Sequence, residues 1–177
     1  CIQLVTHIEH LLIQPGKHIH LIGLSGTGKS LISKFVAKYL NMKIFCLHEH
    51  HNYTINDFDF DLRKVLKASL EHKVCFIIKE SDIILPSFTE KLNVLLAEMY
   101  VPDLFTGDEL NSLLSSIKEF AHEKGQTLDN EESLISFFIQ NIRNNLHIVF
   151  TSNSATLDIN QIEVTFPSLC SVCNMIW

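Results

Sequence analysis

The sequence is poor in glycine, proline and positive charge, and each shortage excludes a class of protein. Six Gly and four Pro in 177 residues exclude collagen-like, low-complexity and linker-rich chains. Fourteen Lys and Arg stand against twenty Asp and Glu, a formal net charge of -6. The chain lacks the basic concentration that nucleic-acid phosphates select, so we expect no nucleic-acid partner. The longest apolar runs, such as residues 74–78, are far shorter than the roughly 20 residues that span a bilayer, and we expect no membrane partner.

The composition is otherwise that of a packed globular protein. Hydrophobic residues make up 46% of the chain and charged residues 19%, and a length of 177 residues favours a single domain. The chain begins at Cys1 rather than Met and ends at Trp177 within an apolar stretch. We therefore expect a piece of a longer protein.

The five cysteines indicate neither a disulfide framework nor a metal site. Cys46 and Cys75 lie inside apolar runs, where cysteine behaves as a small core residue. Cys170 and Cys173 form one C-x-x-C pair, but a zinc ribbon needs a second pair, and a redox pair would open a helix after an early strand. A reduced, intracellular compartment fits this cysteine usage best.

Short apolar runs alternate with amphipathic segments along most of the chain. The runs at residues 18–23, 44–47, 74–78 and 146–150 predict strands. The segments at 31–40, 57–70 and 88–96 have helical spacing. The first of these helices should bury five apolar side chains: Leu31, Ile32, Phe35, Val36 and Leu40. This order predicts an α/β fold, a parallel sheet with helices on both faces.

Residues 99–145 interrupt this alternation and are expected to form an insertion. The pattern predicts two helices separated by Gly125, which is well placed as a helix stop. The spacings Thr106/Glu109 and Asp129/Glu132 predict a capping box at the start of each helix. An insertion of this length favours a functional surface element.

The strongest motif is a phosphate-binding loop between the first strand and the first helix. It matches G-x-x-x-x-G-K-[ST] in full, and its residues are the predicted cofactor-binding set: Gly23, Leu24, Ser25, Gly26, Thr27, Gly28, Lys29 and Ser30. In such a loop the backbone N–H groups and the helix N-terminus hold phosphate oxygens. Lys29 should reach the β- and γ-phosphates, and the Ser30 hydroxyl should face a metal ion, Mg²⁺. The loop therefore predicts that ATP or ADP binds here.

The strand at 74–78 ends in an unexpected cation. An Asp that holds Mg²⁺ is expected where Lys79 stands, with a Glu after it, and Glu80 is present. Two cations about 4 Å apart repel by about 4 kcal/mol at an effective dielectric near 20, so Lys79 beside Lys29 should weaken Mg²⁺ binding. Two alternatives stay open: Lys79 takes the place of the metal and neutralises the phosphates, or it turns to solvent and leaves a weakened pocket.

The chain resembles the motor region of the dynein heavy chain, specifically its fourth AAA+ module, and the cytoplasmic more than the axonemal kind. The resemblance covers about residues 7–177. N-V-L-L-A at 93–97 followed by V-P-D-L-F-T-G-D-E at 101–109 is more specific than the phosphate loop alone. The other residues that carry the resemblance are 34–37, 53–54, 57–59, 61–63, 79–81, 90, 145–151 and 167–169.

The resemblance implies a P-loop NTPase, the large AAA+ subdomain, over residues 1–177. Glu80 matches the Walker B glutamate and Asn153 matches the polar sensor, which makes them the implied catalytic residues, while Lys79 departs from the Walker B aspartate but stays in the implied nucleotide pocket. Residues 174–177 resemble the last strand, so the helical lid is expected beyond this chain. Ser171-Val172 stands where the family has Asn-Arg, an arginine finger for the preceding module that is worth roughly 10³–10⁵ in rate.

Three functions remain open. The first is a nucleotide-binding ring module of a dynein, part of an ATP-driven, minus-end-directed microtubule motor in the cytoplasm and cytoskeleton, with weak or absent hydrolysis of its own. Its implied partners are the neighbouring AAA+ modules and, through the parent chain, intermediate chains, light chains and microtubules. The second is an active ATPase in which Glu80 or Asp82 replaces the missing aspartate. The third is a stand-alone P-loop kinase, although only Arg63 and Arg143 could clamp a second substrate.

Histidine and aspartate clusters offer weaker alternatives. His48-Glu49-His50-His51 and the pair His7 and His10 lack converging ligands, and we expect surface imidazoles. The alternation Asp57, Asp59, Asp61 lacks the glycine and terminal glutamate of a calcium loop. We expect a solvated helix start there.

Overall fold

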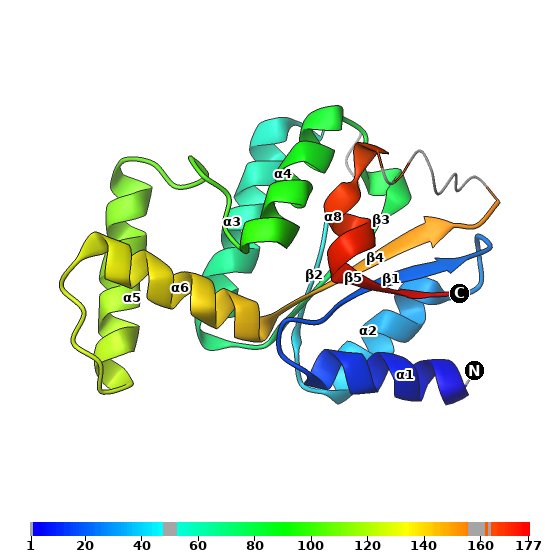
Figure 1. The fold of residues 1–177 in the computed structure, drawn as a ribbon, viewed down its shortest axis with the longest axis horizontal. Coiled ribbons are helices and arrows are strands. Elements are labelled where there is room, and N and C mark those ends of the chain that lie inside the picture. Colours follow the sequence, from blue (N-terminus) through cyan, green and yellow to red (C-terminus); the bar gives the residue numbers. More distant parts are fainter. Residues whose placement is uncertain (1, 48–52, 156–161, 163) are drawn as a thin grey trace.

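The structure, a computed structural model, describes residues 2–47, 53–155, 162 and 164–177. Its centre is a sheet of five parallel strands in the order β2–β3–β4–β1–β5 (Figure 1). The strands are β1 (His18–Gly23), β2 (Lys43–Cys46), β3 (Val74–Lys79), β4 (Leu146–Asn153) and β5 (Cys173–Ile176). The predicted α/β class with a parallel sheet is confirmed.

Helices cover both faces of the sheet, as predicted. The smaller face packs against α1 (Ile2–Ile13) and α2 (Lys29–Tyr39). The larger core holds side chains of α3 (Ile55–Glu71), α4 (Pro86–Glu98), α5 (Asp108–Glu123), α6 (Glu131–Asn145) and α8 (Pro167–Val172). A single 3-10 turn, η1 (Glu80–Asp82), follows β3.

Strand β3 shows why the sheet needs cover on both sides. Val74, Phe76 and Ile78 point into the larger core, whereas Cys75 and Ile77 point into the smaller one. Side chains alternate between the faces of a strand, so a run that is apolar at every position must be buried on both.

The predicted inward face of α2 is partly wrong. Leu31 and Phe35 are 72% and 63% exposed, and the buried residues are Ser33, Val36 and Ala37. Ser33 can be buried because its hydroxyl donates to the backbone carbonyl of Lys29 at 2.9 Å. The spacing of apolar residues therefore predicted the position of the helix correctly but assigned part of its buried face to the wrong side.

Two helices flank Gly125 as expected, but neither begins with a capping box. Helix α5 starts after Gly107 and α6 after Asn130, and neither N-cap has a side-chain hydrogen bond. Each helix starts one residue later than the box at Thr106 or Asp129 requires. Those two predictions are wrong.

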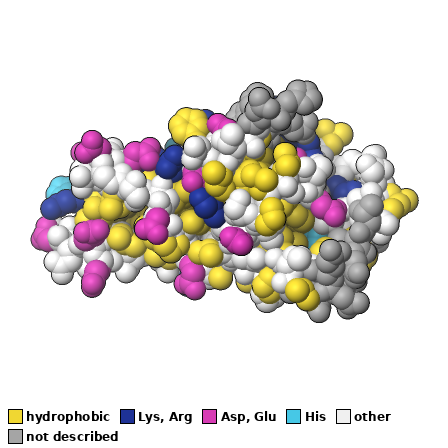
Figure 2. Space-filling view, turned by 90° about the horizontal axis from the view of Figure 1, so that it is seen from above, with side chains coloured by type: hydrophobic (Ala, Val, Ile, Leu, Met, Phe, Trp, Pro, Cys, Tyr) yellow, Lys and Arg dark blue, Asp and Glu magenta, His cyan; other side chains and the backbone are white. Residues whose placement is uncertain are grey.

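The α5–α6 end carries most of the net negative charge of the chain. Residues 99–145 hold eight Asp or Glu against three Lys or Arg, a net charge of -5 within a total of -6. Figure 2 shows acidic side chains gathered at that end of the visible face.

The carboxylates that begin α3 are engaged rather than merely solvated. Asp57 completes a capping box with the N-cap Thr54, and Asp59 forms an ion pair with Lys91 of α4. Asp61 is buried and accepts a hydrogen bond of 2.8 Å from the Tyr53 hydroxyl. The expectation of a solvated helix start is wrong for Asp61, because packing of α3 against the core brings a phenol to it.

Arg63 connects α3 to the segment before α5. Its Nη1 donates to the carbonyl of Leu104 at 2.9 Å, and its Nε lies 3.4 Å from a carboxylate oxygen of Glu109. Both partners belong to the V-P-D-L-F-T-G-D-E segment, so this half-buried guanidinium holds the start of the predicted insertion against the core.

Replacing Arg63 with Met should lower the free energy of unfolding by about 2 kcal/mol, because the hydrogen bond from a charged group is lost while the Leu104 carbonyl stays in place. Urea denaturation followed by circular dichroism measures this. The matched control is Arg143→Met, which removes the other, exposed arginine and should change stability by less than about 0.5 kcal/mol. Equal losses in the two variants would contradict the role given to Arg63.

Candidate nucleotide site

The phosphate-binding loop lies at the carboxyl edge of the sheet, between β1 and α2. Strand β1 lies between β4 and β5. After β1 the chain forms β2 at one edge of the sheet, builds β3 and β4 back toward β1, and then adds β5 on the other side of β1. Open parallel sheets bind ligands where the strand order switches in this way. The backbone N–H of Ser154 donates to the carbonyl of Gly23 at 3.1 Å and joins the loop to the end of β4.

Two glycines give the loop its shape. Gly26 and Gly28 have φ angles of 79° and 80°, which side chains with a Cβ rarely adopt. A Cβ at either position would meet nothing within 4 Å, so conformation rather than space selects glycine there. Gly28 is the N-cap of α2 and makes no side-chain cap, so the first-turn N–H groups of α2 remain available to an anion.

Lys29 lies folded against its own loop. Its Nζ donates to the carbonyl oxygens of Gly23 and Leu24, both at 2.7 Å. These two acceptors keep the ammonium beside the loop that would cradle a phosphate. A phosphate oxygen would offer it a charged acceptor in their place.

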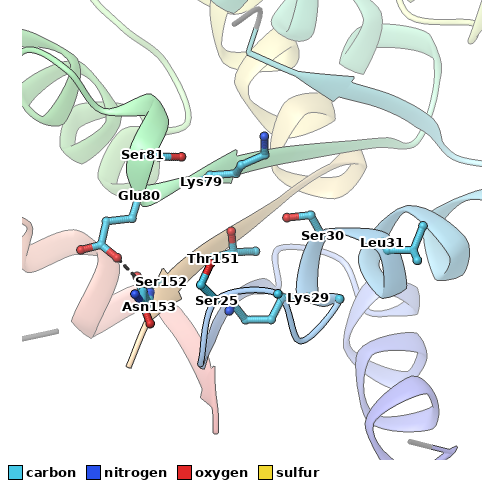
Figure 3. A pocket seen from close by; sticks show the side chains of 12 residues that line it. Ser25, Lys29, Ser30, Leu31, Lys79, Glu80, Ser81, Thr151, Ser152 and Asn153 are labelled. Atoms are coloured by element: carbon cyan, nitrogen blue, oxygen red, sulfur yellow. Dashed lines mark hydrogen bonds between the residues drawn. The ribbon is translucent and has the colours of Figure 1, made fainter. Parts of the chain in front are cut away.

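The loop forms one wall of a hollow of about 550 Å³ (Figure 3). Most of the predicted site residues line it: Ser25, Gly26, Gly28, Lys29, Ser30, Lys79, Glu80 and Asn153. Gly23, Leu24 and Thr27 belong to the loop but do not line the hollow; the Thr27 hydroxyl donates to the Leu24 carbonyl at 2.8 Å.

Sequence reasoning missed four lining residues: Leu31, Ser81, Thr151 and Ser152. Thr151 and Ser152 directly follow the apolar run at 146–150, and β4 continues through them to Asn153. Polar residues just beyond a buried parallel strand were the signal that could have found them, since the carboxyl ends of such strands meet at one edge.

Glu80 reaches across to the end of β4. Its Oε2 accepts a hydrogen bond of 2.9 Å from the backbone N–H of Asn153, drawn as the dashed line in Figure 3. The two implied catalytic residues are therefore brought together. This bond holds the carboxylate at the side of the hollow that faces the loop.

Lys79 is half-buried at the end of β3 and separates two hollows. The second, of about 470 Å³, lies beside the first and shares Ser30 with it. In Figure 3 the side chains of Lys79 and Lys29 point in different directions, Lys29 toward its loop and Lys79 away from it. The two side chains therefore do not point toward each other, unlike the close pair of cations that the sequence suggested.

The residues present fit a phosphate chain better than they fit Mg²⁺. Ser30 supplies a hydroxyl, but the Lys79 ammonium has no lone pair to give to a metal. Asp82 lines the second hollow, and its Oδ2 accepts from the backbone N–H of Lys79 at 2.9 Å. Within the described ranges, no group of three or more His, Cys, Asp or Glu could hold a metal ion.

The weaker alternatives lose support or go untested. Residues 48–51, with three of the clustered histidines, lie outside the described residues. Burial raises the pKa of the Cys173 thiol to about 12, opposite to what a redox C-x-x-C requires, and Cys46, Cys75 and Cys173 are free thiols. Over the part of the chain that the structure describes, no helix is long and apolar enough to cross a bilayer.

Comparison with known proteins decides the family. The family model for the P-loop containing dynein motor region D4 matches residues 1–177. The chain belongs to this family. A cytoplasmic dynein heavy chain of Dictyostelium discoideum is 42% identical over 175 residues, 98% of this chain and 4% of that relative. Those of Drosophila melanogaster and Saccharomyces cerevisiae are 41% and 36% identical, each over 98% of this chain and 4% of the relative.

This D4 module therefore spans about 4% of the length of these heavy chains. The predicted resemblance to the fourth AAA+ module of a cytoplasmic dynein is confirmed. The structure gives a physical reason for one of its specific segments. Asn93, in N-V-L-L-A, donates to the carbonyl of Thr165 and accepts from the N–H of Ser168, both at 3.2 Å, and so fastens α4 to the start of α8.

Proposed function

We propose that this D4 module binds ATP or ADP in the hollow beside the phosphate loop, as part of an ATP-driven, minus-end-directed microtubule motor. The observation that carries the proposal is the loop itself, with left-handed Gly26 and Gly28 at the switch point of a parallel sheet and Lys29 folded along it. The loop amides and Lys29 bind the phosphates, and the α2 N-terminus adds a partial positive charge.

We further propose that the module's own hydrolysis is weak or absent. Lys79 occupies the position from which a carboxylate would hold Mg²⁺, and a cation there repels the metal. Its side chain points away from the loop in Figure 3, so the ammonium would have to turn toward the loop to neutralise part of the phosphate charge. The nucleotide then serves the module as a bound structural element and is turned over slowly.

An active ATPase is the second candidate, because the bond from Asn153 holds Glu80 in a defined place. Asp82 supports it less, since its carboxylate is engaged with the backbone of Lys79 on the side of the second hollow. ATP turnover that disappears in Glu80→Gln while nucleotide stays bound would favour this candidate, measured in a heavy chain that contains the lid and both neighbouring modules.

The hypothesis of a stand-alone P-loop kinase has the least support. A small-molecule kinase clamps its second substrate with basic side chains near the phosphates. Arg63 is engaged with Leu104 and Glu109, and Arg143 is exposed on α6; neither lines the hollow.

The proposed partners follow from the family. We propose that the module contacts neighbouring AAA+ modules of its own heavy chain. Intermediate chains, light chains and microtubules would be reached through other parts of that chain, in the cytoplasm and on the cytoskeleton. The names of the relatives, cytoplasmic dynein heavy chains, support this location.

ATP should bind with an affinity that depends little on Mg²⁺, by less than about threefold, because the residues present make a poor metal site. Calorimetry of ATP in Mg²⁺ and in chelator measures this. Lys79→Asp should restore a Mg²⁺-dependent gain of about tenfold or more, since a carboxylate returns to the metal position. Lys73→Asp, at the exposed residue just before the same strand, is the matched control and should restore nothing. A large Mg²⁺ dependence in the unmodified chain would contradict the role of Lys79.

A further inference from the structure

A buried histidine lies directly behind the wall of the nucleotide hollow. His20, on β1, is 1% exposed, and its Nε2 lies 2.7 Å from the hydroxyl oxygen of Ser152 on β4. Its ring meets Phe150 edge-on with 5.4 Å between centroids. Nδ1 of the same ring is buried and has no hydrogen-bond partner within the described residues.

The unpartnered Nδ1 decides which way the hydrogen bond runs. Burial lowers the pKa of His20 to about 4, so at neutral pH the ring carries one proton. If that proton were on Nδ1, an N–H would be buried without an acceptor, a situation that folded proteins avoid more strictly than an unused lone pair. The proton therefore lies on Nε2, and His20 donates to Ser152.

This direction leaves the Ser152 hydroxyl with its own proton to donate. Ser152 is 1% exposed, yet it lines the hollow beside Asn153 and next to Glu80. Thr151 pairs with Lys79 at the end of β3, and Glu80, the first residue of η1, accepts from the N–H of Asn153, the residue after Ser152. Ser152 and Glu80 both line the hollow that the Lys29 loop also lines (Figure 3).

We propose that Ser152 donates a hydrogen bond to the terminal phosphate of a bound nucleoside triphosphate, and that His20 is the positioning residue that fixes the hydroxyl as a donor. The proposal rests on the nucleotide site proposed above and adds to it a specificity: the site recognises a triphosphate over a diphosphate through a neutral side chain, without a metal. The end of the phosphate chain is the group that reaches the Glu80 and Asn153 wall, because the loop and the α2 N-terminus hold the phosphates nearer the base.

The test compares ATP and ADP binding, in chelator, to the chain and to Ser152→Ala. We expect the variant to bind ATP about ten- to a hundredfold more weakly, the loss expected for one hydrogen bond to a charged group, and to bind ADP as before. The matched control is Ser69→Ala. Ser69 is also fully buried, and its hydroxyl donates within α3 to the Val65 carbonyl at 2.7 Å. That variant should lose stability without changing the ratio of ATP to ADP affinity.

Two changes at His20 separate positioning from packing. His20→Gln can place an amide N–H near the position of Nε2 and should retain most of the ATP preference, whereas His20→Phe keeps a ring but no donor and should lose it. Equal weakening of ATP and ADP in Ser152→Ala, or an unchanged ATP preference, would overturn the proposal while leaving nucleotide binding intact. Failure of the unmodified chain to bind either nucleotide would instead overturn the proposed function.

The tautomer can be measured without any variant. Nitrogen-15 NMR of the His20 ring should report a proton on Nε2 and a bare Nδ1. A proton on Nδ1 would make Ser152 the donor to His20, and the proposal would be wrong whether or not the variants fold.

Discussion

Lys29→Met should weaken ATP binding by at least about a hundredfold, the largest effect expected at the site. A single pair of unit charges 4 Å apart is worth about 4 kcal/mol at an effective dielectric near 20, and a hundredfold change in affinity needs about 2.7 kcal/mol. The Lys29 ammonium is already beside the loop, bonded to Gly23 and Leu24, so little ordering of the side chain is required when a phosphate arrives. Calorimetry or a fluorescent nucleotide analogue measures the affinity.

The same substitution further along α2 controls for the loss of a positive charge. Lys38 is exposed in the last turn of the helix, and Lys38→Met should change ATP affinity by less than about threefold. Lys29→Met also removes two hydrogen bonds to loop carbonyls, so its unfolding curve should be recorded beside the binding curve. Unchanged ATP affinity in a folded Lys29→Met variant would contradict a phosphate-binding role for this loop.

The sequence predicted the loop well because its chemistry is local. The strand, an eight-residue motif with four fixed positions and the helix are recognised from neighbouring residues, and the structure places the motif at the junction of β1 and α2. Buried parallel strands were predicted equally well, because a run that is apolar at every position, such as 74–78, is typical of a strand that is covered on both faces. The start of α3 was predicted two residues too late, because Thr54 and Asp57 form a capping box that begins the helix at Ile55.

The parts that were missed depend on contacts between distant segments. Strand β4 runs three polar residues past its apolar core because it keeps pairing with β1, through Leu21 with Thr151 and on to Gly23 with Asn153. Helix α1 was not predicted, although Ile8, Leu11 and Leu12 have helical spacing and are buried. The direction of the Lys79 side chain could not be predicted, because it depends on how β2, β3 and α2 pack around it.

Three histidines have a buried role that the sequence did not predict. Surface imidazoles were expected for residues 48–51 and for His7 and His10, and the last two are exposed. No role was expected for His18, His20 and His147, which are buried in the strands. His18 accepts a hydrogen bond of 3.0 Å from the backbone N–H of Ile148, and Nδ1 of His147 lies 3.0 Å from the carbonyl of Lys17. Period-two alternation cannot distinguish a buried polar residue with such partners from a solvent-facing one.

These three histidines make acid the condition that should most destabilise the fold. Burial, with a smaller effect of nearby His147, lowers the pKa of His18 to about 4, and burial lowers that of His20 to about 4. Burial also lowers the pKa of His147, and Lys73 adds to this, while its contact with the Lys17 carbonyl opposes it. All three therefore stay neutral in the folded chain at a pH where the unfolded chain has begun to protonate them.

The free energy of unfolding should consequently be highest above pH 6.5, the ordinary pKa of histidine, and fall as the pH is lowered toward 4. Below 6.5 the unfolded state binds protons that the folded state refuses, and each of His18 and His20 should contribute a loss of about 3 kcal/mol across that window. Urea denaturation at half-unit pH steps measures the slope of the free energy of unfolding against pH, which reports the number of protons bound on unfolding. In His20→Gln that number should be lower by about one. His122→Gln, on the exposed side of α5, should leave the slope unchanged. If the unmodified chain, His20→Gln and His122→Gln all had the same slope, acid unfolding would be assigned to carboxylates. The buried histidines would then be protonated in the folded state.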